Sequence, residues 1–106
     1  MSIKKKPKSD AVKTLERITG GPLTLARLIQ SIRLGEEVTL AEFAKKLGVS
    51  RQHLCDIEKG RKVVSPERAA RFAFVLGYSK EQFVALALQA LVDEAALDLK
   101  VEVKAA

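Results

Sequence analysis

The sequence has little cysteine and histidine and no long run of apolar residues. With one Cys and one His in 106 residues, it excludes a disulfide-stapled scaffold, a zinc finger and a Cys/His metal cluster formed within one chain. No apolar run approaches the roughly 18 residues that cross a bilayer. The basic start of the chain continues into a charged, amphipathic stretch, so we expect no secretory signal. These absences favour a protein of the reducing cytoplasm that has no metal and no cofactor.

The chain does have enough apolar material for one folded core. Hydrophobic residues make up 47% of it, which excludes a disordered basic tail, and its length suits one domain of about 100 to 200 residues. The formal net charge is +6, and residues 1–17 and 45–62 each contain six basic and two acidic residues. Such clusters favour a polyanionic partner, although charge alone leaves nucleic acid, membrane surface and acidic protein open.

Capping signals and apolar spacing divide the chain into short helices. Ser or Thr precedes stretches in which apolar residues stand three or four apart, and Gly follows several of them. Thr39 with Glu42 forms a capping box, and Pro66 after Ser65 is a typical first helical residue. Along the last helix the apolar positions include Val84, Leu88 and Leu91. The sequence predicts helices over about residues 9–18, 23–35, 39–47, 51–59, 66–76 and 79–96.

The most informative stretch runs from residue 39 to residue 60. Two short helices are joined there through Gly48, Val49 and Ser50. Gly48 can take a positive φ and end the first helix, Val49 fills the angle between the helices, and Ser50 caps the second. Residues suited to a close helix crossing stand on either side: Ala44, Leu54 and Ile57.

This stretch resembles the helix-turn-helix of the Xre/Cro-type (lambda-repressor-like) DNA-binding family. The family pattern A-x-x-x-G-[VI]-S-x-x-x-[IL]-x-x-[IL]-E-x-G is matched in register by Ala44, Gly48, Val49, Ser50, Leu54, Ile57, Glu58 and Gly60. The resemblance covers roughly residues 24–77. It implies an all-α, five-helix domain over residues 23–96, with its motif at 39–60. A basic N-terminal arm with an extra short helix would precede it at 1–22, and a strand or tail would follow at 97–106.

In such a motif the second helix, residues 51–59, lies in the major groove of DNA. Because Leu54 and Ile57 face the core, the opposite face presents the candidate base contacts Arg51, Gln52, Cys55 and Asp56. Arg51 suits guanine and Gln52 suits adenine. Asp56 could accept a hydrogen bond from cytosine or could repel phosphate. The alternative is a solvated face with no role.

Contacts to the DNA backbone are expected from the residues around this helix. The candidates are Thr39, Ser50, His53, Lys59, Arg61 and Lys62, and the last two resemble the family's phosphate-binding loop. Where the family commonly has a phosphate-binding Gln at the start of the first motif helix, this chain has Leu40, so Thr39, Lys45 or Lys46 could replace that contact.

Glu58 is expected to have a structural role. In the family this Glu often pairs with an Arg on the preceding long helix, and the register indicates Arg33. The ion pair would hold the recognition helix, residues 51–59, against the helix predicted over residues 23–35.

The C-terminal tail changes to strict alternation of apolar and polar residues, which predicts a strand. Paired antiparallel with its own copy about Val101, it would oppose Lys100 to Glu102 and Leu99 to Val103. We therefore expect a dimer strand formed by Leu97, Leu99, Lys100, Val101, Glu102 and Val103. An intrachain hairpin, a frayed tail and addition to another protein's sheet remain alternatives. The N-terminal lysines are interpreted as a flexible arm that contacts phosphate or as a solvated tail.

The function implied by the resemblance is sequence-specific binding of double-stranded DNA by a cytoplasmic transcriptional regulator, a repressor that acts as a two-fold homodimer. The alternative is an antitoxin that binds a toxin protein and represses its own operon. An enzyme is not expected, because the sequence offers no Gly-rich phosphate loop and no nucleophile with a matched base.

Overall fold

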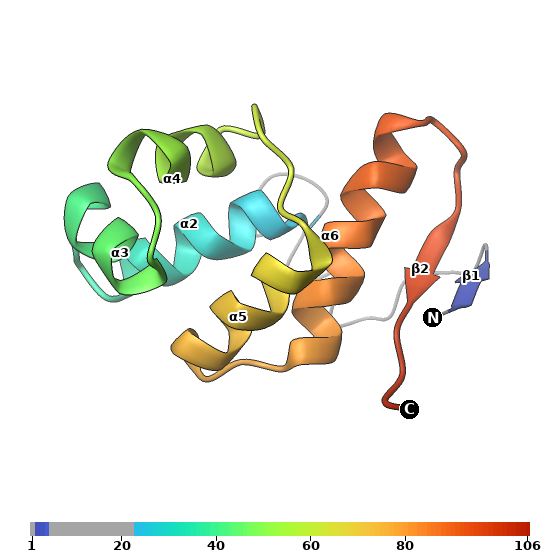
Figure 1. Ribbon diagram of the computed structural model, residues 1–106. Helices are drawn as coiled ribbons and strands as arrows, with labels where there is room; N and C mark the ends of the chain where they lie inside the picture. The colour runs from blue at the N-terminus through green and yellow to red at the C-terminus, as the bar shows by residue number, and fades with distance from the viewer. Residues whose placement is uncertain (1, 5–22) are drawn as a thin grey trace.

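Five helices and two short strands make up the described part of the chain, residues 2–4 and 23–106 of a computed structural model (Figure 1). The helices are α2 (Leu25–Gly35), α3 (Leu40–Leu47), α4 (Arg51–Glu58), α5 (Pro66–Leu76) and α6 (Lys80–Glu94). The strands are β1 (Ser2–Lys4) and β2 (Lys100–Glu102). The expected all-α, five-helix fold is confirmed, whereas the predicted helix over residues 9–18 lies outside the described residues.

Each of these helices begins at a side-chain cap. The hydroxyl of the residue before the first turn accepts a hydrogen bond from the backbone N–H three residues later, which satisfies one of the donors left open at a helix start. At Thr39 the cap is a full capping box, because the Thr39 N–H also donates to the Glu42 carboxylate at 3.1 Å. That backbone hydrogen bond lowers the pKa of Glu42. The caps are Thr24, Thr39, Ser50, Ser65 and Ser79.

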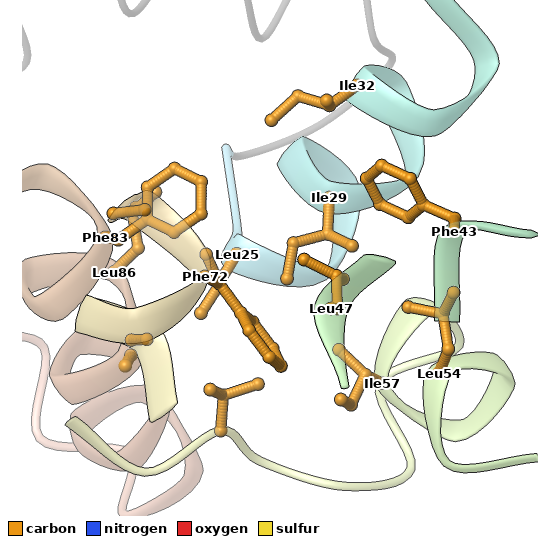
Figure 2. Packing of buried hydrophobic residues seen from close by; sticks show 14 of the residues in the cluster. Leu25, Ile29, Ile32, Phe43, Leu47, Leu54, Ile57, Phe72, Phe83 and Leu86 are labelled. Atoms are coloured by element: carbon orange, nitrogen blue, oxygen red, sulfur yellow. The ribbon is translucent and has the colours of Figure 1, made fainter. Parts of the chain in front are cut away.

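A single hydrophobic core lies between the helices (Figure 2). Its largest fully buried side chains include Phe43 of α3, Phe72 of α5 and Phe83 of α6. On α6 the core face is formed by Phe83, Leu86 and Ala87, and Leu91 is 43% exposed. Of the apolar positions that stand out in the sequence, Val84 packs against this core while partly buried, and Leu91 faces solvent. The sequence missed the core face because α6 is apolar on most of its sides and spacing alone does not select a face.

The two strands form one antiparallel pair beside α6 (Figure 1). Ile3 stands opposite Val101, with Ser2 opposite Glu102 and Lys4 opposite Lys100. Residues 2–4 are thus a strand and not part of a flexible arm. The predicted strand at the C-terminus exists, but only residues 100–102 of it form a paired strand.

A side chain of α6 holds the same strand. The Gln89 amide donates to the Leu99 carbonyl and accepts from the Val101 N–H, both at 2.7 Å. Since the Val101 N–H is used in this way, the alternation of an antiparallel ladder leaves Lys100 and Glu102 to bond with β1. The strand thus pairs within its own chain, but with residues 2–4 and not in the hairpin that the sequence left as an alternative. Self-pairing about Val101 would have to displace either β1 or Gln89.

Candidate nucleic-acid interface

The corner between α3 and α4 sets the direction of α4. Gly48 ends α3 with φ 75° and ψ 30°, and its N–H and that of Val49 bond back to carbonyls of α3. An added Cβ at Gly48 would meet nothing within 4 Å, so the requirement for glycine comes from the left-handed backbone. Ala44 is 2% exposed and Leu54 is fully buried. The small residue Ala44 of α3 and the apolar residue Leu54 of α4 therefore allow α4 to pack closely against the core.

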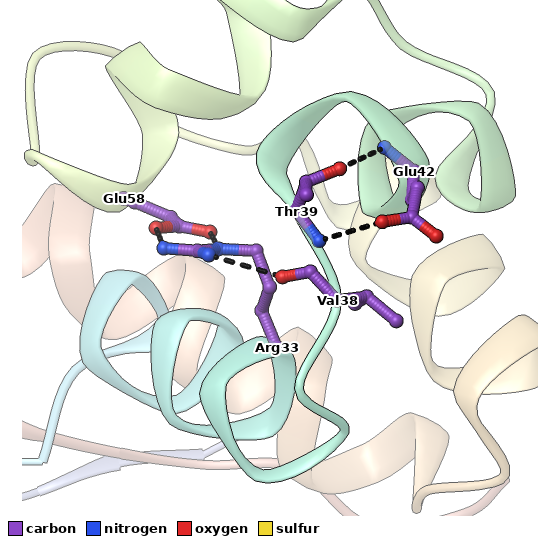
Figure 3. A network of polar contacts seen from close by, with 5 residues as sticks. All are labelled: Arg33, Val38, Thr39, Glu42 and Glu58. Atoms are coloured by element: carbon purple, nitrogen blue, oxygen red, sulfur yellow. Dashed lines mark hydrogen bonds and ion pairs between the residues drawn. The ribbon is translucent and has the colours of Figure 1, made fainter.

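An ion pair fixes α4 to α2 (Figure 3). Arg33 Nε donates to Glu58 Oε2 at 2.8 Å and Arg33 Nη2 donates to Glu58 Oε1 at 3.0 Å. Arg33 Nη1 also donates to the Val38 carbonyl at 3.3 Å, which ties in the loop before α3. The side chains are 14% and 4% exposed, and the bonds to Glu58 raise the pKa of Arg33. The ion pair predicted from the register is present.

The outer face of α4 carries the predicted base contacts. Arg51 and Gln52, in its first turn, are exposed, whereas Cys55 and Asp56 are half-buried. The structure therefore brings the four residues to one helix and presents two of them fully to solvent.

Asp56 lies within a small polar network. Gln52 Nε2 donates to Asp56 Oδ1 at 3.1 Å, and Arg61 Nη1 donates to the same oxygen at 3.5 Å. The Asp56 side chain is 16% exposed. One oxygen of the Asp56 carboxylate, Oδ1, is thus engaged by protein groups.

His53 contacts a residue that the sequence did not single out. Arg68 Nη1 donates to His53 Nε2 at 3.1 Å. Because a guanidinium can only donate, the imidazole accepts and is neutral in this contact. Partial burial lowers the pKa of His53, the charges of Arg68 and Lys62 act in the same direction, and Asp56 opposes them. The place of Arg68 in the first turn of the next helix is the one feature of the sequence that could have indicated a contact with α4.

The predicted backbone contacts surround this face. As N-caps, Thr39 and Ser50 accept from the backbone N–H groups of Glu42 and His53 through their hydroxyl oxygens, and each hydroxyl retains an O–H donor. Lys59, Arg61 and Lys62 are exposed on the turn after α4. Of the substitutes for the family's Gln, Lys46 is paired with Glu36 at 3.1 Å. Exposed donors and positive charges thus lie at both ends of α4, an arrangement suited to phosphate groups.

None of the helices in residues 23–106 is both long and apolar enough to cross a membrane.

Comparisons with known proteins agree with this architecture. Residues 24–86 match a family model described as a helix-turn-helix domain. A solved structure, that of the clp gene regulator ClgR from Corynebacterium glutamicum, is 34% identical to this chain. The match covers 70% of this chain and 79% of that one, with a TM-score of 0.50. No curated protein sequence matches the chain.

Proposed function

Since the chain belongs to the Xre/Cro-like helix-turn-helix family, we propose that it is a sequence-specific regulator of transcription that binds double-stranded DNA. In this proposal α4 enters the major groove and its first turn reads base edges. The observation that carries this proposal is that α4 buries one face in the core while Arg51 and Gln52, in its first turn, are exposed to solvent. The similarity to a protein described as a gene regulator supports it.

The chemistry of this turn fits base recognition. Arg51 can donate two hydrogen bonds to O6 and N7 of guanine, and Gln52 can pair with N6 and N7 of adenine. Lys59, Arg61 and Lys62 would neutralise phosphates and set the register on the duplex. We further propose that the bound protein blocks access to a promoter and so acts as a repressor.

Selection of bound duplexes from a random pool, at a stated salt concentration, tests the proposal. We expect one recurring motif, and Arg51→Ala and Gln52→Ala should each relax the preference at a different base pair. Arg71→Ala is the matched control, because Arg71 is an exposed arginine on α5. If the wild-type protein selects no motif, or if both α4 variants select the wild-type motif, the proposal fails.

We also propose that the protein binds as a two-fold dimer, because one helix-turn-helix covers only a half-site. The C-terminal strand is one candidate interface, but its self-pairing has to compete with β1 and Gln89. Sedimentation of the full chain and of a chain ending at Ala96 separates the possibilities. A dimer that survives the truncation would place the interface outside the strand.

Exposed apolar side chains at the end of α5 offer a surface for a protein partner, and with it we propose a second candidate function, that of an antitoxin. Phe74 is 86% exposed, Tyr78 45% and Val75 37%, and clustered exposed apolar side chains are typical of protein-binding surfaces. This candidate predicts that a toxin encoded next to this gene co-purifies with the protein. Phe74→Ser should prevent co-purification without changing the DNA motif. A toxin that still binds the Phe74→Ser variant would not use this surface.

A further inference from the structure

Asp56 joins the recognition helix to the turn that follows it by both its side chain and its backbone. The carboxylate accepts from Gln52 Nε2 at 3.1 Å and from Arg61 Nη1 at 3.5 Å. Its carbonyl oxygen accepts from the N–H groups of Arg61 at 2.8 Å and Lys62 at 3.3 Å. Three of the four bonds come from the turn, so the turn holds Asp56 in place while Asp56 contacts Gln52.

This contact decides which end of the Gln52 amide points outward. A carboxylate accepts hydrogen bonds and cannot donate them, so the amide turns its NH₂ group toward Asp56 and its oxygen away from it. The exposed side of Gln52 then carries the carbonyl oxygen and the second N–H of the amide side by side. Without Asp56 the amide could rotate by half a turn and exchange these two groups.

The fixed orientation distinguishes the purines. Adenine presents a donor, N6, beside an acceptor, N7, which matches an outward amide oxygen next to an N–H. Guanine presents two acceptors, O6 and N7, so the fixed amide oxygen would face a lone pair. A rotating amide could instead turn its NH₂ group toward guanine.

We propose that Asp56 is a positioning residue that makes Gln52 select adenine over guanine, an inference that rests on the proposed function. Arg61 supports this role from the turn, because its guanidinium, one nitrogen of which lies 3.5 Å from Asp56 Oδ1 while the side chain is 61% exposed, offsets the Asp56 charge and still presents donors to the DNA phosphates. Asp56 therefore acts through Gln52 and touches no base itself, which differs from both roles that the sequence left open for it, a direct contact to cytosine and repulsion of phosphate.

The experiment measures binding by fluorescence anisotropy on duplexes that carry each of the four base pairs at the position relaxed by Gln52→Ala. For the wild type we expect about a tenfold preference for adenine over guanine, within the range of one well-placed amide contact. Asp56→Ala should reduce this preference to about twofold or less at the same position, and leave the preference read by Arg51 unchanged. The double variant Gln52→Ala/Asp56→Ala should show the same base preference as Gln52→Ala alone, because Asp56 acts only through Gln52.

Asp56→Asn separates positioning from charge. Its side-chain oxygen can still accept from Gln52, although its own NH₂ also admits the reversed amide, so we expect a preference between those of the wild type and Asp56→Ala. A purely electrostatic role would make the Asn and Ala variants alike and would raise affinity for all four duplexes equally. Glu67→Ala, the loss of an exposed carboxylate on α5, is the matched charge control, and thermal melting monitors folding of each variant.

Two results would overturn the inference while leaving the proposed function intact. One is an unchanged adenine preference in Asp56→Ala. The other is loss of preference at a base pair that Gln52→Ala does not affect, which would make Asp56 a direct base contact. A wild-type protein that prefers no sequence would instead overturn the proposed function, and this inference with it.

Discussion

Removing Arg33 should destabilise the fold far more than removing a surface lysine that makes the same kind of contact. Arg33→Ala deletes two hydrogen bonds to Glu58, at 2.8 and 3.0 Å, and leaves behind a carboxylate whose side chain is 4% exposed. Breaking a buried ion pair from one side costs about 3 to 5 kcal/mol. Arg33 itself is 14% exposed and keeps some hydration, so we expect about 3 kcal/mol, the lower end of that range.

The matched control is Lys46→Ala. Lys46 and Glu36 are also joined by one ion pair, at 3.1 Å, but their side chains are 44% and 38% exposed. An exposed pair of this kind contributes at most about 1 kcal/mol. The contrast between the two variants therefore measures burial together with the greater number of hydrogen bonds that Arg33 makes.

Urea unfolding followed by circular dichroism measures both variants. With a slope of about 1.5 kcal/mol per molar, the midpoint for Arg33→Ala should fall by about 2 M, and the slope should not change. The double variant Arg33→Met/Glu58→Leu should recover more than half of the loss, because it leaves no buried charge unpaired. Equal losses for Arg33→Ala and Lys46→Ala, or no recovery in the double variant, would refute the reasoning.

Four further predictions concern the backbone at two positions, proton binding and salt. Gly48→Ala should lower the free energy of unfolding by about 1 kcal/mol, because φ at this position is 75°. Ala96→Gly should raise the free energy of unfolding by about 0.5 to 1 kcal/mol, because Ala96 has φ 55°. Thermal melts check both variants, and a change of the same sign in the two would contradict the reasoning. Between pH 7.5 and 5.5 the wild type should lose stability as the pH falls through the ordinary His53 pKa of 6.5, since the unfolded chain takes up the proton first. His53→Gln should remove that slope in urea titrations, and an identical slope would exclude His53 as its source. Lys62→Ala should weaken binding to all duplexes alike and reduce the slope of log affinity against log salt by about one, whereas a change confined to one base pair would count against a phosphate contact.

The parts of the fold that the sequence predicts correctly depend on local signals. The Gly48 corner and the capping box at Thr39 each involve residues within a few positions of one another, so spacing reveals them. The pairing of Arg33 with Glu58 spans 25 positions, and the sequence predicts it only because the family motif gives the register between the two helices.

The parts that the sequence does not predict depend on packing between distant segments. The Arg68–His53 contact joins two helices and leaves no pattern in either. Gln89 supports β2 through an amide side chain, which no strand signal indicates. A three-residue strand such as β1 is too short for alternation to identify, and its partner lies at the other end of the chain.

The pairing of β1 with β2 also means that residues 2–4 and 100–102 stabilise each other. Because Ile3 stands opposite Val101, trimming either end removes the partner of the other, so deletions at the two ends should not have additive effects. The same closeness makes the chain suitable for circular permutation, with the ends joined by a short linker and new ends opened at the Gly77–Tyr78 turn after α5. A fusion partner attached at either end would lie on the α6 side of the molecule, away from α3 and α4 (Figure 1), and the recognition helix would stay accessible.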